Sequence, residues 1–337
     1  METAETSRLG GLRARGTALG GVVPPVGLLL VAGAAGLLVG SLRSSLFAQL
    51  TVQGLALGAV YGSLALALVL VYRATRVVNF AQGELALLTT YAAYQLMQWG
   101  LSYWEAFAAT LAIAFALGTA LQVVLIRPVQ HRSVIAAVIV TVGLFILIDG
   151  VVDWIWGANF KFMQSPFGTK TYHVGGVAIA KLYPGMFVVV GVSVLLVWAL
   201  FRFTKLGLGM RAAAFRPAEA ALVGVPVDWM LAIGWGLAAV LGAVAGLMAE
   251  PTQFFLDPTL MQPILVYAFA AAVLGGLESP AGAVVGGLAI GVSLNLAVQY
   301  VHPISSELQT PVAFAVLVGV LLLKPSGLFG RREVRRV

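Results

Sequence analysis

The chain has 337 residues, of which 60% are hydrophobic and only 10% are charged. In soluble domains roughly a quarter of all residues are charged, so this composition excludes a soluble globular protein and indicates an all-α, membrane-embedded one. The net charge of +7 does not indicate a nucleic-acid partner, because the basic residues lie between apolar runs and form no face interleaved with aromatic residues. The absence of cysteine excludes disulfides, thiolate catalysis and cysteine-ligated metal.

The amino-terminal region carries Arg8, Arg13 and Arg15 ahead of an apolar run over residues 16–42. A cleavable signal peptide has a shorter apolar core, of roughly 7–15 residues, followed by a small-residue cleavage site. Because this run is long enough to span and further apolar segments follow, we predict a retained anchor. Residues 1–45 then form a cytoplasmic tail and the first anchor segment.

Apolar stretches recur along the rest of the chain, and a helix needs about 20 apolar residues to cross the hydrocarbon core. The eighth stretch is short for a full crossing and could be a re-entrant or broken helix. The sequence leaves open whether the third and the eighth cross fully. Ten segments are predicted, with ends uncertain by several residues: 17–40, 46–72, 77–99, 106–126, 133–156, 184–203, 229–249, 264–277, 283–301 and 310–323.

The distribution of lysine and arginine predicts the orientation, because these residues favour the cytoplasmic side. With ten crossings and the amino terminus inside, sixteen of the 20 basic residues lie inside and four outside. Both termini are therefore predicted to be cytoplasmic, residues 157–184 to be outside and residues 202–228 to be inside. Segments 2–5 begin outside and segments 7–10 begin inside, so a structural repeat would be inverted.

Two longer connections stand out between the apolar segments. Residues 157–184 are polar and turn-rich, long enough for a small hairpin. In the inner connection, Pro217 suits the first position of a helix, Glu219 suits its first turn, and Gly224 can adopt the left-handed conformation that ends it. A short helix over 217–223 is predicted, and it is either a lever for a partner or an ordinary connector.

Several kinds of chemical site are excluded or disfavoured. The chain lacks the Gly-x-x-x-x-Gly-Lys-Ser/Thr loop that cradles the phosphates of ATP. Its three histidines, His131, His173 and His302, are isolated in different loops, which argues against a metal site and against a Ser-His-Asp set.

Polar residues near the start of the third segment are the first candidates for a function. Asn79 and Glu84 flank Gly83, and an ionisable group near membrane depth marks either a pathway or a buried pair. Arg73 and Arg76 are near enough in sequence to form a structural salt bridge with Glu84, and both readings stay open.

Asp149 and Asp153 lie four positions apart on one helical face near the outer end of the fifth segment. They are either solvated groups at a helix end or the lining of an outer vestibule that meets an amino group. Gln53, Tyr61, Ser63, Thr141, Ser293 and Asn295 could line a polar path or form bonds between helices. The small-residue cluster of Gly282, Gly286 and Gly287 favours tight helix packing. The candidates for a path or gate are Asn79, Gln82, Gly83, Glu84, Asp149 and Asn295.

The inner connection carries a resemblance to a known family. The stretch TKLGLGMRAAAFRPAEAALVGVPVDWMLAIGWGLAAVLGAVAGLM, residues 204–248, resembles the inner loop of branched-chain amino acid ABC permeases. Its Glu219-Ala220-Ala221 followed by Gly224 is similar to the EAA loop, by which ABC permeases dock into their ATPases. Two residues separate Ala221 from the glycine here, whereas the general pattern has three.

Three further blocks carry the same resemblance. VYRATRVVNFAQGELALLTTYAAY, residues 71–94, is similar to the Asn-Phe-Ala-His-Gly-Glu signature of the LivH-type subunit, with Gln82 in place of histidine. AFAAAVLGGLESPAGAVVGGLAIGV, residues 268–292, and LLKPSGLFG, residues 322–330, resemble the family's carboxy-terminal signatures. The four blocks lie between residues 71 and 330, and the resemblance is taken to cover the chain from about residue 46 to 330.

The resemblance implies a permease domain over residues 46–330, a basic cytoplasmic tail over 331–337, and a location in the bacterial plasma or inner membrane. It implies ABC ATPase subunits, a second LivM-like permease and an extracytoplasmic substrate-binding protein as partners, with no cofactor bound by this chain and ATP used by the ATPases. The cargo would be a branched-chain or other apolar amino acid, moved by alternating access. The residues that the resemblance assigns to ATPase coupling are Arg216, Pro217, Glu219, Ala220, Ala221 and Gly224.

Two rival functions are weighed against this one. A self-contained channel or secondary transporter for a small neutral solute, such as urea or an amide, would need a coupling-ion site, usually an acidic residue at the bilayer midplane. No aspartate or glutamate lies at the centre of a predicted segment. An intramembrane enzyme would need paired catalytic residues, and the sequence suggests none.

Overall fold

The computed structural model describes residues 45–130, 133–168, 170–174, 177–300, 308–323 and 327–329. The chain divides into two compact units, residues 1–48 and 49–337, and the second holds the elements described next apart from residues 45–48 at the start of the first helix. The predicted anchor, 17–40, and the predicted basic tail, 331–337, lie outside the described residues.

Each of the nine segments predicted after the anchor coincides with a helix. Among the described residues, six helices are long and apolar enough to cross a membrane. Three further helices, Gln82–Gln98, Met261–Gly275 and Gln309–Leu323, have only 17, 15 and 15 residues. The first two of them correspond to the third and eighth predicted segments, whose full crossing the sequence left open. Ten crossings therefore stay a prediction. The elements are α3 (Ser45–Thr75), α4 (Gln82–Gln98), α5 (Tyr103–Leu121), the π-helix η1 (Gln122–Ile126), α6 (Arg127–Gln130), α7 (Val134–Trp156), β1 (Thr171–Val174), β2 (Val177–Ala180), α8 (Leu182–Phe203), α9 (Lys205–Phe215), α10 (Pro217–Leu222), α11 (Val227–Gln253), α12 (Met261–Gly275), α13 (Pro280–Tyr300) and α14 (Gln309–Leu323).

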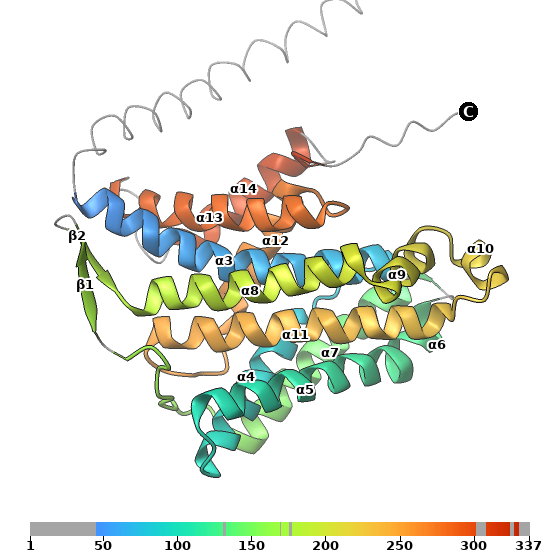
Figure 1. Ribbon diagram of the computed structural model, residues 1–337, viewed down its shortest axis with the longest axis horizontal. Helices are drawn as coiled ribbons and strands as arrows, with labels where there is room; N and C mark the ends of the chain where they lie inside the picture. The colour runs from blue at the N-terminus through green and yellow to red at the C-terminus, as the bar shows by residue number, and fades with distance from the viewer. Residues whose placement is uncertain are drawn as a thin grey trace, which may run out of the picture. The chain divides into compact units, whose positions relative to one another are not determined.

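Two helices form the centre of the bundle. In α3 and α11, 89% and 78% of the most apolar stretch is buried, against 17% in α8. A helix that is apolar on all sides is stable only when other helices surround it. In Figure 1, α11 runs between α5 and α8, and it packs against both.

Glycines let the central helix α3 approach α13 closely. A Cβ atom added at Gly58 would lie 2.8 Å from the carbonyl oxygen of Gly287, and one added at Gly286 would lie 3.1 Å from the carbonyl carbon of Ala271 on α12. Such backbone contact is how small residues hold membrane helices together by van der Waals packing. The predicted packing role of the glycine cluster on α13 is therefore confirmed. The same contact on α3 also uses Gly54 and Gly62.

The connection from α3 to α4 has the same geometry as the connection from α11 to α12. Arg76 and Phe254 are the non-glycine residues with positive φ in the described part of the chain, at 56° and 63°. Three positions later, the Asn79 side chain accepts a hydrogen bond from the Ala81 N–H at 3.1 Å, and the Asp257 side chain accepts one at 2.6 Å from the N–H two residues on. Each long helix thus ends in the same turn before a short helix.

A contact between the two central helices joins residues that are as far apart in the sequence as the two turns are. Ser63 Oγ on α3 donates a hydrogen bond of 3.0 Å to the carbonyl oxygen of Leu241 on α11, and the two residues are 178 positions apart. That spacing also separates Arg76 from Phe254. The residues themselves show no detectable repeat, because many different side chains can form the same turn. The geometry agrees with the predicted repeat of segments 2–5 and 7–10, and its inversion in the membrane stays a prediction.

The two longer connections lie at opposite ends of the bundle (Figure 1). The predicted hairpin is present, with β1 and β2 antiparallel and Thr171 paired with Ala180. At the other end, α9 and α10 form the inner connection, in which only one helix was predicted. Placement at opposite ends is what the predicted orientation requires, and which end is cytoplasmic stays a prediction.

Candidate functional site

The short helix α10 has the features that its sequence predicts. It begins at Pro217 and ends at Leu222, and Gly224 has a φ of 83°. The Gly224 N–H donates to the carbonyl oxygen of Ala221 at 3.0 Å, and the next N–H donates to that of Ala220 at 3.0 Å. Because only glycine adopts this φ without strain, Gly224 defines where α10 stops and how the chain turns toward α11.

The loop around α10 combines a buried anchor with exposed apolar side chains on either side of the helix. Ala220 is buried, whereas Leu222 and Val223 are 87% and 80% exposed and Phe215 is 78% exposed. Apolar side chains gathered on an otherwise polar connection mark a surface that a partner covers. Sequence reasoning named the small residues of this loop and missed these three larger ones. The available signal was large apolar residues at both ends of a short polar helix.

Electrostatic contacts in the loop are local. Arg216 lies 3.8 Å from Glu219 in an exposed ion pair, and its guanidinium lies over the ring of Phe215. Exposed pairs of this kind contribute little stability. Glu219, in the first turn of α10, is therefore available to meet a charged partner.

The loop is mechanically tied to the central helix α11. The helix α9 packs against both α8 and α11, and the Thr204 side chain caps it by accepting the Gly207 N–H at 3.0 Å. Arg127 of α6 forms an ion pair with Asp228 in the first turn of α11. A displacement of α10 would therefore act on α9 and on the start of α11.

A second cluster of polar residues surrounds the start of α4, which begins at Gln82 rather than at the predicted residue 77. Asn79 is fully buried and makes the turn that delays the helix. Its Nδ2 donates to Gln82 Oε1 at 3.0 Å, and Gln82 Nε2 donates to the Ala238 carbonyl oxygen on α11 at 3.0 Å. A Cβ atom added at Gly83 would lie 3.1 Å from the Leu265 side chain. These three candidates hold α4 against α11 and α12.

Glu84 stands apart from its neighbours in this cluster. It is 1% exposed, and neither carboxylate oxygen has a hydrogen-bond partner among the described residues. The alternative of a salt bridge to Arg73 or Arg76 is wrong, because neither oxygen of Glu84 has a partner in the described part of the chain and Arg76 pairs with Glu278, in the turn between α12 and α13. That hydrogen bond raises the pKa of Arg76 above its usual value. A buried acid without a partner is costly, so Glu84 is a candidate for function rather than for stability.

Asp149 is a second acid, on the helix α7 that packs against α4. It lies half-buried on α7 and acts electrostatically on Glu84. The two helices are locked further along, where Trp156 Nε1 donates to Gln95 Oε1 at 3.0 Å. Asp153 is exposed one turn beyond Asp149. The structure thus places Glu84 and Asp149 on two contacting helices, and no group of three metal-binding side chains occurs among the described residues.

Asn295 has a structural role. Its Nδ2 donates a hydrogen bond of 2.6 Å to the Leu50 carbonyl oxygen, which links α13 to α3. The polar side chain therefore joins two helices, the second of the roles that the sequence left open.

Glu250 was missed by the sequence reasoning. The segment was predicted to end at 249, but α11 continues to Gln253, so Glu250 lies inside the helix and is 1% exposed. The backbone of Met163, in the long outer connection, acts on its carboxylate. An acid directly after an apolar run was the available signal. Glu84 lies in the first turn of α4 and Glu250 in the last turn of α11, so neither buried acid is at the centre of its helix, where a coupling-ion site is expected.

Comparison with known proteins identifies relatives over most of the chain. The profile of a family described as "Branched-chain amino acid transport system / permease component" matches residues 50–323. The high-affinity branched-chain amino acid transport system permease protein LivH of Escherichia coli (strain K12) is 30% identical over 305 residues, which cover 86% of this chain and 98% of the relative. The corresponding protein BraD of Pseudomonas aeruginosa is 28% identical, with the same coverage of 86% and 98%.

More distant similarities reach other solutes. The fructose import permease protein FruF of Bifidobacterium longum is 25% identical over 260 residues, covering 72% of this chain and 68% of the relative. Among solved structures, PsaBC from Streptococcus pneumoniae in complex with Fab matches with a TM-score of 0.46 and 15% identity, covering 87% of this chain and 97% of the matched chain. A likeness at that TM-score carries no conclusion.

Proposed function

This chain belongs to the branched-chain amino acid permease family, and from that premise we propose that it is the membrane subunit of an ATP-driven ABC importer for branched-chain or other apolar amino acids. The observation that carries the proposal is α10, a short helix at one end of a membrane bundle with exposed large apolar side chains at and just beyond its two ends. Such a surface fits the groove of a soluble ATPase.

The contacts of α10 give the proposal a mechanism. ATP binding would close the ATPase pair and displace α10, and the packing of α9 on α8 and α11 would carry the displacement into the bundle. Because α11 is buried among the other helices, its movement shifts their packing as a unit. The expected result is alternating access to a path between two permease subunits.

The acids on α4 and α7 suggest where a cargo would pass. Glu84 and Asp149 offer carboxyl groups on the contacting helices α4 and α7, and an amino acid carries a positive ammonium group. Opposite charge would offset the cost of burying both.

The proposed partners follow from family membership and from what this chain lacks. Without a phosphate-binding loop, it would bind no ATP, and two ATPase subunits would supply that site. A LivM-like permease would complete the path, and an extracytoplasmic binding protein would deliver the amino acid and select it. No cofactor is expected on this chain.

Reconstitution tests the proposal. Proteoliposomes with the full set of partners should accumulate radiolabelled leucine only when ATP is enclosed with the ATPases. Proteoliposomes containing this chain alone should neither accumulate leucine nor hydrolyse ATP. Concentrative uptake or ATP hydrolysis by the chain alone, free of contaminating subunits, would overturn the proposed function.

A further inference from the structure

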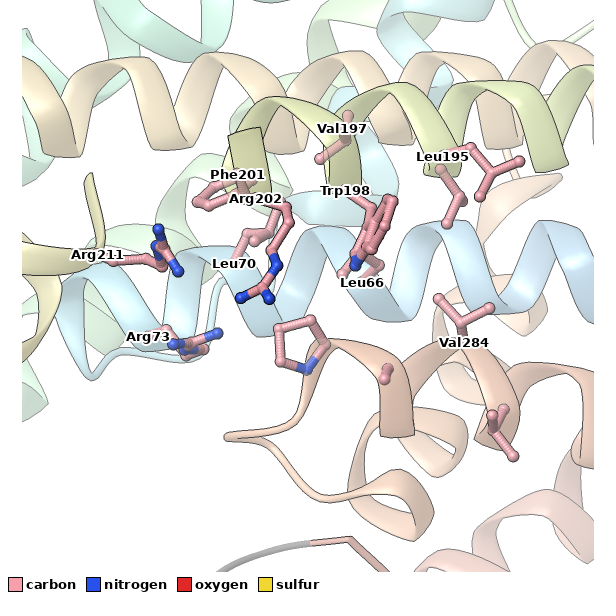
Figure 2. A pocket seen from close by; sticks show the side chains of 14 residues that line it. Leu66, Leu70, Arg73, Leu195, Val197, Trp198, Phe201, Arg202, Arg211 and Val284 are labelled. Carbon is pink, nitrogen blue, oxygen red and sulfur yellow. The ribbon is translucent and has the colours of Figure 1, made fainter. Parts of the chain in front are cut away.

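A groove between α3, α8 and α13 is unrelated to the sites described so far. Its cavity volume is about 460 Å³. Most of its wall is apolar, including Leu70, Trp198 and Val284. Figure 2 shows these side chains along the groove, with three arginines gathered at one end.

The arginines come from three different helices. Arg73 lies near the end of α3, Arg202 near the end of α8 and Arg211 on α9, and all three line the same groove. No carboxylate is among the described residues that line it. Glu278 lies near enough to act on Arg73, but its hydrogen bond goes to Arg76. Three like charges therefore meet at one end of an apolar groove.

An anion at this end would remove the repulsion among the guanidinium groups. The planar guanidinium donates paired hydrogen bonds that match a phosphate. The apolar remainder of the groove fits an aliphatic chain. A ligand that satisfies both parts has an anionic phosphate head and a hydrocarbon tail.

We propose that this groove binds one anionic phospholipid, with its phosphate on Arg73, Arg202 and Arg211 and an acyl chain along α3, α8 and α13. Basic pockets between membrane helices on the cytoplasmic side are suited to such headgroups. The basic end of the groove includes Arg211 of α9, so it lies at the end of the bundle that is predicted to be cytoplasmic. Because Arg211 belongs to α9, the lipid would stabilise the support of α10.

Other occupants fit less well. The chain's own apolar run at 16–42 follows Arg8, Arg13 and Arg15, which are predicted to lie on the same side as the arginines of the groove. Like charges would oppose that placement. Free phosphate would pair with the arginines and leave the apolar wall exposed.

The amount of phospholipid that the purified permease retains tests the proposal directly. The purified full-length permease in its assembled complex is delipidated in detergent, supplied with phosphatidylglycerol or phosphatidylcholine, and examined by native mass spectrometry. The wild type should retain phosphatidylglycerol in preference to phosphatidylcholine. Each basic residue near an anionic headgroup contributes on the order of a fivefold change in affinity, so R202Q/R211Q should bind roughly thirtyfold more weakly.

Two further variants make the result specific. K205Q removes an exposed positive charge that does not line the groove, and it should retain lipid as the wild type does. A281W keeps every charge and fills the groove, and it should lose phosphatidylglycerol. Equal retention by all variants, or no retention by the wild type, would overturn the proposal. So would unchanged retention in A281W combined with displacement by inorganic phosphate, since the site would then take phosphate alone.

Discussion

Substituting valine for Gly224 tests whether the shape of the turn after α10 is needed for coupling. The residue has a φ of 83°, and no atom of the described residues lies within 4 Å of the position that a Cβ atom would occupy. A change at this site therefore acts on the backbone and removes no packing contact. The perturbation is limited to the direction in which the chain leaves α10.

The magnitude follows from the conformational preference of L-residues. The left-handed region costs a non-glycine residue about 1–2 kcal/mol, and a β-branched side chain raises that cost. The helix α10 has six residues and cannot be stable without its neighbours. A change of one or two kcal/mol shifts the population of the native turn by a factor of roughly 5 to 30.

The assay is co-purification of the ATPase with the permease, normalised to the amount of permease, together with leucine uptake. G224V should lower both by about tenfold while the permease remains inserted and abundant, and G224A should lower them less. Gly100 gives a matched control, because it has a φ of 98° and the same open surroundings, in the turn between α4 and α5.

G100V should strain the backbone equally and leave ATPase recovery unchanged. If G224V retains wild-type ATPase recovery and uptake, the turn after α10 is only a connector and the coupling role must be withdrawn. If G100V lowers ATPase recovery as much as G224V, the effect comes from general destabilisation.

Two other predictions address the acids and the orientation. E84Q and D149N should lower leucine uptake with normal ATPase recovery, whereas D153N, one turn away and exposed, should not. Because E84Q exchanges a buried carboxyl group that has no hydrogen-bond partner among the described residues for an amide of similar size, its thermal stability should not fall below that of the wild type. Unaltered uptake in E84Q and D149N would refute a role in the path. An impermeant thiol reagent should label K170C in intact cells and A218C only after permeabilisation, and the reverse pattern would refute the predicted topology.

Local features of this protein could be predicted from its sequence, because their causes lie in consecutive residues. Helix positions follow from apolar stretches, and α10 follows from Pro217 at its start and Gly224 at its end. The small residues on α13 predict close packing because their lack of side chains is a property of each residue. The family blocks are likewise short and contiguous.

Only the tertiary structure decides which distant residues meet. Arg76 is eight positions from Glu84, yet it pairs with Glu278, 202 positions away. The same holds for Asn295, whose partner Leu50 is 245 positions away. Hydrogen bonds and ion pairs depend on distances of a few ångströms between atoms, and spacing along the chain does not determine those distances across a bundle. The burial of Glu84 and the meeting of three arginines in one groove arise for that reason from the packing of the helices.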